Sequence, residues 1–372
     1  MDMRPGLPGA EIEALCERFA GRAASADESS EFVSENYGDL RSSSLLAAAV
    51  PAEHGGGGLE LAGLARMLRS MARACPSTAL AFSMHTHLVA TAAWRWKHQK
   101  APVAPLLERV ARERLVLVST GGGDWLDSSG EAKRVEGGYR ISMRKPFSSA
   151  CQAGDLLSSS AVLREEGKPA EVLHFGVPMK AKGLRIEPTW SAMGMRGTGS
   201  HDVVLEDVQV PEAAVNLRRP QGKWHPVFDI LSVIALPLIY AVYVGVAEAA
   251  RDRALSLVRK RRPDEHLVQF TGEMENQLAA ARLAIEDWVA IGMGATRPAR
   301  ADTARAMTDR TLVARAVLAT LDAAMDVAGG AAFFRKNGLE QLFRDAQGAR
   351  YHPLNEGLQR AFTGRFALGL DS

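Results

Sequence analysis

The spacing of hydrophobic residues along the chain changes twice. Apolar residues recur every three or four positions in Glu11–Ala24 and Leu59–Ala74, which predicts helices packed on one face. From about residue 115 to 220 they alternate in short runs between Gly, Ser and Pro, which predicts strands. These runs are Val116–Thr120, Tyr139–Lys145, Asp155–Leu163, Val172–Pro178, Leu184–Trp190 and Val203–Val210. From about residue 226 onward the helical spacing returns.

This order of periods predicts an α+β multidomain protein with three parts. We expect an N-terminal helical domain over residues 1–114, a central β domain over 115–222 and a C-terminal helical bundle over 223–372. The Gly-rich turn Val50–Leu59 cannot be helical and separates two helices of the first domain.

One segment, Ile230–Ala247, is almost wholly apolar and about long enough to span a bilayer. It contains Ser232 and Pro237, however, and continues directly into the charged stretch Glu248–Arg262. A helix buried at the centre of a bundle has the same pattern. We adopt that interpretation and expect no association with a membrane.

Composition narrows the class of protein. The 372 residues are 47% hydrophobic and carry a net charge of +2 without a long run of one sign, so nucleic acid is not an expected partner. The cysteines Cys16, Cys75 and Cys151 are few and odd in number, and the first nine residues lack a secretory pattern. Both features favour a cytoplasmic protein. No metal centre is expected, because the nine histidines and the cysteines lack ligand spacing.

The most specific motif lies in Trp190–Pro211, where Gly194-Met-Arg-Gly-Thr-Gly-Ser-His-Asp202 leads into an alternating strand. It resembles the G-M-R-G-T-x-S-x-D signature of the acyl-CoA dehydrogenase superfamily, which lies beside a flavin. Val50–Leu59 and Leu342–Ala346 resemble two further motifs of that superfamily, P-x-x-x-G-G-x-G-L and L-x-R-D-A. The resemblance implies an N-terminal helical domain, a central β-barrel-like domain and a C-terminal four-helix bundle, assembled as a homodimer or homotetramer.

The resemblance also assigns residues around the flavin ring. Thr120 matches the Thr of the family's T-E-P-x-x-G-S-D loop, although the Glu and Pro are absent. Arg144–Ser149 falls where the family has G-x-K-x-W-I-T-N. Phe147 would therefore pack on the isoalloxazine, and Ser149 would hydrogen-bond near its N5 atom.

A second group is implied to hold the rest of the cofactor across a dimer interface. Arg261 and Gln269 correspond to the family's R-x-F-G region, and Gly329 and Gly330 correspond to its Q-x-x-G-G-x-G motif. Asp326 replaces the Gln of that motif, and a carboxylate there would repel a pyrophosphate. We therefore expect either weakly bound FAD or FMN.

The catalytic base of an acyl-CoA dehydrogenase is missing. Desaturation needs a carboxylate to remove the α-proton. Aligning Tyr351–Arg360 with the family's I-Y-E-G-T-x-x-I-Q-R places Pro353 at one known base position, and the other falls on Ala235. Leu236 stands where several relatives have an acyl-CoA-binding Arg. Glu356 is the one nearby carboxylate that could serve as a relocated base.

Histidines occur where the base is absent. His352 precedes Pro353, and His85 and His87 lie on a predicted helix that reaches the pocket in this superfamily. Because residues two apart on a helix point in different directions, we expect one of these two to face the site. With Ser149, they resemble the reduced-flavin monooxygenases of the superfamily, the dibenzothiophene monooxygenase-like branch. That branch acts through a C4a-peroxyflavin formed from reduced flavin that a separate reductase supplies.

Three functions follow as hypotheses. The favoured one is a reduced-flavin-dependent monooxygenase acting on a hydrophobic small molecule, with His352, His85 or His87, and Ser149 as catalytic candidates. The alternatives are an acyl-CoA dehydrogenase with a relocated base and a non-catalytic flavin- or ligand-binding homologue. We expect the substrate pocket to be lined by Trp125, Trp190, Met193 and Tyr240.

Overall fold

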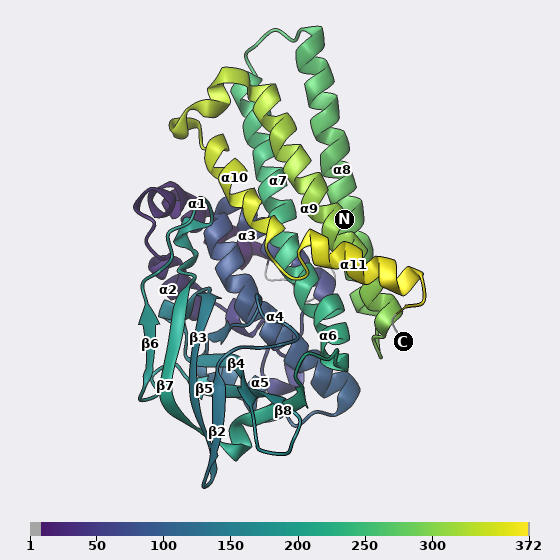
Figure 1. Cartoon of the computed structure of the whole chain (residues 1–372). Coiled ribbons are helices and arrows are strands. Elements are labelled where there is room, and N and C mark those ends of the chain that lie inside the picture. Colours follow the sequence, from purple (N-terminus) through teal and green to yellow (C-terminus); the bar gives the residue numbers. More distant parts are fainter. Residues whose placement is uncertain (1–8, 371–372) are drawn as a thin grey trace.

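The computed structural model describes residues 9–370 of the chain. Residues 1–8, on which the absence of a secretory pattern was argued, lie outside the described part. A group of N-terminal helices, a sheet and a long helical bundle follow one another along the sequence and pack together (Figure 1).

The N-terminal part is helical, as predicted. Its helices are α1 (Gly9–Ser29), α2 (Ser34–Ser42), α3 (Leu61–Ala74), α4 (Pro76–Gln99) and α5 (Ala104–Glu113). Helix α4 begins with Pro76 at its first position, where a missing N–H costs nothing. Nearly all of its length is buried, because it packs on α3, on α7 of the C-terminal part and on strand β1. It therefore carries its side chains into the junction of all three parts (Figure 1).

The central part is one eight-stranded sheet. Its strands are β1 (Leu117–Ser119), β2 (Glu131–Val135), β3 (Gly138–Ser148), β4 (Leu156–Leu163), β5 (Glu171–Pro178), β6 (Leu184–Glu187), β7 (His201–Pro211) and β8 (Val215–Pro220). They pair in the order β6-β7-β3-β2-β4-β5-β8, and β1 pairs with β4. The sheet encloses a core of its own, but within residues 9–370 its edge strands β6 and β8 do not pair, so the expected barrel is open.

All six predicted strands are present, and two others were missed. Strand β2 is mostly charged, and its one fully buried side chain is Ala132, so its alternation is too weak to read. Strand β8 carries Arg218 and Arg219 side by side, which resembles a loop in the sequence. Both are held by pairing with β3, β4 and β5, which the local pattern does not contain.

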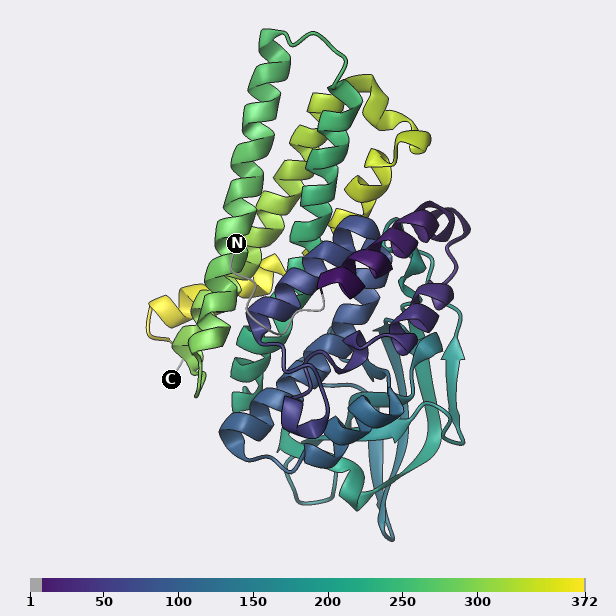
Figure 2. The same cartoon turned by 180° about the vertical axis from the view of Figure 1, so that it is seen from behind.

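The C-terminal part contains α6 (Pro226–Ile230), a π-helical turn (Leu231–Ala235), α7 (Leu236–Val258), α8 (Glu265–Gly294), α9 (Arg300–Ala328), α10 (Leu339–Ala346) and α11 (Glu356–Ala367). Helices α7, α8 and α9 are long, and each runs antiparallel to the one before it. The short α10 packs on α7 and α9 as the fourth member of the bundle (Figures 1 and 2).

Two helical stretches are long and apolar enough to cross a membrane, Pro226–Val258 and Arg300–Phe333. The most apolar window of the first is 94% buried inside the protein, as a core helix would be, because α7 is surrounded by α3, α4, α8, α9 and α10. The corresponding window of the second is only 56% buried. Part of its apolar surface is therefore uncovered in the single chain.

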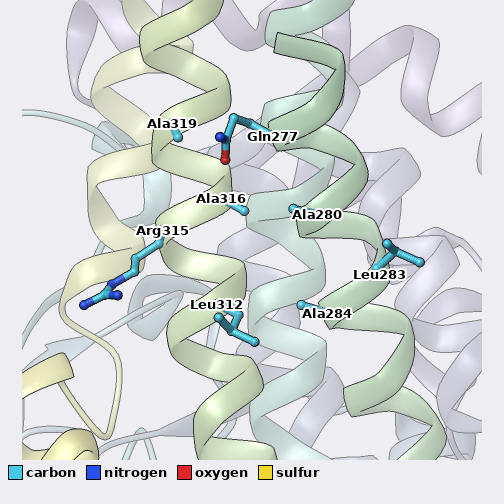
Figure 3. Close-up of a pocket in the computed structure, with 8 residues that line it drawn as sticks. All are labelled: Gln277, Ala280, Leu283, Ala284, Leu312, Arg315, Ala316 and Ala319. Atoms are coloured by element: carbon cyan, nitrogen blue, oxygen red, sulfur yellow. The ribbon is translucent and has the colours of Figure 1, made fainter. Parts of the chain in front are cut away.

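That uncovered surface includes a shallow groove between α8 and α9 (Figure 3). The groove has a volume of about 510 Å³, and four of its eight lining residues are Ala, with Leu283 and Leu312 at its rim. Leu283 is 68% exposed and Leu312 is 49% exposed. Large apolar side chains exposed along one face of a helix pair are typical of a surface that another protein covers.

Candidate active site

Segments from all three parts of the chain meet around His352. Nε2 of His87, on α4, lies 3.2 Å from Oγ of Ser119 at the end of β1. In the Gly-rich loop after β1, a Cβ atom at Gly122 would lie 3.9 Å from the ring of Pro353. Helix α4, the sheet and the 351–353 segment thus enclose one site.

The His352 ring is held by two tyrosines of α7. Oη of Tyr243 lies 2.7 Å from Nε2 of His352, and the ring of Tyr240 contacts the imidazole edge-on with centroids 6.1 Å apart. Desolvation lowers the pKa of His352 to about 3, with further lowering by the positive charge of Arg310 and by His87. His352 is therefore a neutral imidazole at neutral pH.

Arg310 fixes the segment that carries His352. The residue is only 1% exposed, and its guanidinium donates to the carbonyl oxygens of Ala349 at 3.0 Å, Arg350 at 3.0 Å and His352 at 2.9 Å. Tyr240 donates to the Ala349 carbonyl at 2.9 Å. In the described part of the chain no carboxylate forms an ion pair with Arg310, so carbonyl dipoles solvate this buried charge.

The structure separates the two histidines of α4. Nδ1 of His85 accepts from the Leu117 N–H at 3.1 Å, and its Nε2 donates to the Leu46 carbonyl at 2.8 Å. Both ring nitrogens are occupied by backbone, so His85 is structural and not a catalytic candidate. Nδ1 of His87 is buried and has no partner among residues 9–370. Desolvation lowers the pKa of His87 to about 4, which keeps it neutral as well.

Phe147 and Ser149 lie at the end of β3, where the Phe147 ring is exposed and the Ser149 hydroxyl is buried. Phe147 is 65% exposed, and its ring meets that of Trp190 edge-on with centroids 6.1 Å apart. Oγ of Ser149 lies 2.7 Å from Oγ of Ser200, in the loop whose motif resembles the flavin-binding signature. An uncovered aromatic face beside a hydroxyl pair suits a flat heteroaromatic ring.

The sequence did not reveal what anchors the Gly-rich loop. Nζ of Lys145, on β3, is buried and donates to Oδ2 of Asp124 at 2.6 Å and to Oγ of Ser129 at 2.9 Å. Desolvation lowers the pKa of Lys145, whereas Asp124 raises it. Thr120 is fixed nearby by donating to Oγ of Ser159 at 2.6 Å. A lysine at an inward-facing position of an alternating strand was the signal available in the sequence.

The four predicted pocket residues do not form one group. Trp190 lies beside Phe147, and Tyr240 lies under His352. Trp125 stacks on Phe228 of α6 with centroids 5.1 Å apart, in a separate aromatic cluster. Met193 is 57% exposed, and its carbonyl accepts from Arg344. Of the four residues, Tyr240 therefore lies on the His352 side and Trp190 on the Phe147 side, whereas tertiary packing places Trp125 and Met193 elsewhere.

The predicted cofactor-cradle residues lie at the end of the bundle away from the sheet (Figure 1). Arg261 pairs with Asp264 at 3.2 Å in the loop between α7 and α8, and Gln269 donates to Glu265 one turn along α8. Gly329 and Gly330 follow α9, and a Cβ atom at either would meet open space. In one chain this group does not reach Phe147, so it could serve only a cofactor shared between subunits.

Glu356 is poorly suited to act as a base. It forms an ion pair with Arg315, and that hydrogen bond together with the charges of Arg315 and Arg360 lowers its pKa. Ala235 is buried in the π-helical turn, and Pro353 packs near Gly122. Among residues 9–370 no cluster of His, Cys, Asp and Glu could hold a metal ion.

Comparison with known proteins identifies the family. Residues 10–107 match the acyl-CoA dehydrogenase N-terminal domain, and residues 238–356 match the acyl-CoA dehydrogenase C-terminal domain. The chain belongs to the acyl-CoA dehydrogenase superfamily and has its fold. It is a flavin-dependent oxidoreductase of that superfamily, and its relatives include monooxygenases and nitrososynthases.

Three relatives illustrate the range. Putative acyl-CoA dehydrogenase YdbM of Bacillus subtilis is 27% identical over 92% of this chain and 91% of its own length. Isobutylamine N-hydroxylase of Streptomyces viridifaciens is 26% identical over 82% of this chain and 81% of its own. The structure of KijD3 in complex with FMN and an amino-keto sugar nucleotide superposes with a TM-score of 0.89 at 25% identity, covering 99% of this chain and 96% of that one.

Proposed function

We propose that this protein is a reduced-flavin-dependent monooxygenase that oxygenates a hydrophobic small molecule through a C4a-peroxyflavin. The observation that carries the proposal is the pair of neutral histidines, His352 and His87, at the site where Pro353 stands in place of a dehydrogenase's carboxylate. A neutral imidazole is both a hydrogen-bond donor and an acceptor. It is suited to orienting oxygen or a substrate heteroatom, whereas the lowered pKa of both rings makes them weak bases for removing a proton from carbon.

The two alternatives are less well supported. For a dehydrogenase, Glu356 would have to leave its pair with Arg315, and its lowered pKa makes it a weak base. For a homologue that binds flavin or a ligand without catalysis, the buried and unpartnered Nδ1 of His87 would serve binding alone, and the second histidine, His352, would have no purpose. An orphaned polar atom in the interior costs about 1–3 kcal/mol, which favours a site that a ligand completes.

The residues present fit a flavin. Phe147 would pack on the ring, and Ser149 and Thr120 would contact its polar edge. Arg261, Gln269, Gly329 and Gly330 would reach a cofactor bound mainly by a second subunit. KijD3 binds FMN, and we propose that this chain uses FMN or weakly held FAD, because Asp326 would repel a pyrophosphate. Reduced flavin supplies the electrons that activate oxygen.

The same proposal includes the partners. We propose a flavin reductase as the source of reduced flavin, a cytoplasmic location, and a homodimer or homotetramer. The apolar groove between α8 and α9 is the surface on which a second copy would pack (Figure 3). Its Ala-rich lining permits close approach of another helix.

The test is a stopped-flow experiment. The protein is mixed with photoreduced FAD or FMN and then with oxygenated buffer, and absorbance is followed on the short-wavelength side of the oxidised flavin band. We expect a transient before oxidised flavin appears. Direct reoxidation without a transient, together with bleaching of bound FAD by acyl-CoA thioesters, would establish the dehydrogenase instead. A protein that binds flavin but does neither would be the non-catalytic homologue.

His352→Ala separates catalysis from binding. The variant should still bind reduced flavin but lose substrate oxygenation, because it removes the imidazole and keeps the backbone carbonyl that Arg310 holds. His98→Ala is the control, since His98 lies in the last turn of α4 and outside the proposed cofactor cradle. Unaltered oxygenation by His352→Ala would remove this residue from the mechanism.

A further inference from the structure

The hydrogen bond between Tyr243 and His352 has a defined direction. Desolvation raises the pKa of Tyr243 well above its usual value, so its hydroxyl is protonated at any working pH. The hydroxyl is buried on α7, and Nε2 of His352 is its one hydrogen-bond partner within residues 9–370. If Nε2 donated to the tyrosine, the phenol proton would be left without an acceptor in the interior, at a cost of about 1–3 kcal/mol. The phenol therefore donates, and Nε2 accepts.

An acceptor at Nε2 determines the rest of the ring. A neutral imidazole carries one proton, so an unprotonated Nε2 requires the proton to be on Nδ1. Desolvation and the charge of Arg310 lower the pKa of His352 to about 3, so the doubly protonated form is not populated near neutrality. The ring's hydrogen bond in the described chain is at Nε2, and His352 is only partly buried, so Nδ1 is open to a ligand.

We propose that Tyr243 is a positioning residue that fixes His352 as its Nδ1–H tautomer and so presents a single N–H donor to the flavin and substrate. This inference deepens the proposed function and rests on it for its chemical purpose. A donor at this point suits an electron-rich ligand atom, such as reduced oxygen or a substrate heteroatom. The reverse tautomer would point a lone pair at the same atom and repel it.

Neighbouring groups make the arrangement rigid. Arg310 donates to the backbone carbonyl of His352 at 2.9 Å. This hydrogen bond holds the main chain of His352 in place and so limits movement of the imidazole. The ring of Tyr240 packs edge-on against the imidazole on another side. A Cβ atom at Gly348 would lie 2.6 Å from the Tyr243 hydroxyl, so only glycine leaves room for that hydroxyl. Tyr243, 109 residues before His352 in the chain, thus acts through packing that spans α7 and the 348–352 segment.

The direct test measures the tautomer itself. Protein labelled with ¹⁵N-histidine is studied by long-range ¹H–¹⁵N correlation without flavin, and the His352→Gln spectrum identifies the signals of His352. We expect Nδ1 protonated and Nε2 unprotonated in the wild type. In Tyr243→Phe, which keeps the ring but removes the donor, the pattern should shift toward the mixture of tautomers found in free histidine. Nε2 protonated in the wild type would overturn the proposal, even if Tyr243→Phe cannot be purified.

Tyr240→Phe is the matched control. It removes another buried hydroxyl of α7 that binds the same 348–352 segment. The Tyr240 hydroxyl donates to the Ala349 carbonyl, however, and not to the imidazole. It should leave the tautomer of His352 unchanged. An equal change in both variants would mean that general loosening, and not the Tyr243 hydroxyl, controls the ring, and would also overturn the proposal.

Turnover supplies a second readout. In the wild-type background Tyr243→Phe should lower the product formed per reduced flavin consumed by about tenfold, the factor expected for one buried hydrogen bond. If the wild type shows no oxygenation, the proposed function fails while the tautomer measurement still decides the role of Tyr243.

Discussion

Lys145 and Asp124 form a buried ion pair, with Nζ of Lys145 2.6 Å from Oδ2 of Asp124. The lysine is two residues before Phe147 on β3, and the aspartate follows the glycines of the loop that reaches Pro353. One ion pair therefore ties the strand that carries the proposed flavin-stacking ring to the loop that closes the His352 site.

Breaking this pair should destabilise the protein and weaken flavin binding. Asp124→Asn leaves the Lys145 ammonium buried without a counter-charge, and we expect a loss of about 3–5 kcal/mol in the free energy of unfolding. Urea unfolding and a flavin titration measure the two effects. Asp127→Asn is the control, because Asp127 is an exposed carboxylate of the same loop. Equal stability of the two variants would contradict the role given to Asp124.

Arg310 should control the order of the 349–352 segment. In Arg310→Leu the carbonyls of Ala349, Arg350 and His352 lose their shared donor, so backbone amide exchange in this segment should accelerate and oxygenation should fall at least about tenfold. Hydrogen exchange by mass spectrometry checks the first effect. Arg315→Gln, on the same helix but with an exposed ion pair, should leave exchange there unchanged.

The activity should show no histidine step near neutral pH. Because desolvation lowers the pKa of His352 to about 3 and that of His87 to about 4, both stay neutral between about pH 5 and 8. The unfolded chain binds protons at these histidines below about pH 6.5, so they make stability fall as pH drops from there toward 4. A rate profile measured at saturating reduced flavin is the check. An acidic limb near pH 6.5 that is absent in His87→Asn would contradict this assignment.

Asp309 should make stability decrease as pH rises. Burial, and then the neighbouring Asp287, raise the pKa of Asp309 to about 7, above its unfolded value near 4, and its Oδ2 has no partner among residues 9–370. The folded state therefore holds the extra proton, and stability is lost as pH increases from about 4 to 7. Asp309→Asn should add about 1–3 kcal/mol at pH 8. Denaturant unfolding at pH 5 and 8 tests this, with the exposed Asp322→Asn on the same helix as control.

A charge in the α8–α9 groove should reduce the assembly state. Leu283→Glu places a carboxylate on the 68%-exposed apolar rim and should convert the proposed oligomer to smaller species, which sedimentation velocity detects. Flavin affinity should fall with it if the cradle residues serve the partner subunit. Arg297→Glu, outside the groove, should change neither property. An unchanged sedimentation coefficient for Leu283→Glu would place the interface elsewhere.

The sequence by itself determined the order of helix, sheet and helix and the placement of Phe147 and Ser149 at the end of one strand. These features depend on periodicity and on motifs of adjacent residues, which are local properties. It also made His352 a catalytic candidate, because that residue lies next to a motif position from which a base is missing.

Only the tertiary structure decided what the buried groups do. His85 and His87 look alike in the sequence, and the packing of α4 against β1 gives the first two backbone partners and leaves the second with a free nitrogen. Tyr243 meets His352 across 109 positions, and Lys145 meets Asp124 across 21. Such pairs form where two separate elements pack together and exclude water. Spacing along the chain does not indicate which face of one element packs against the other.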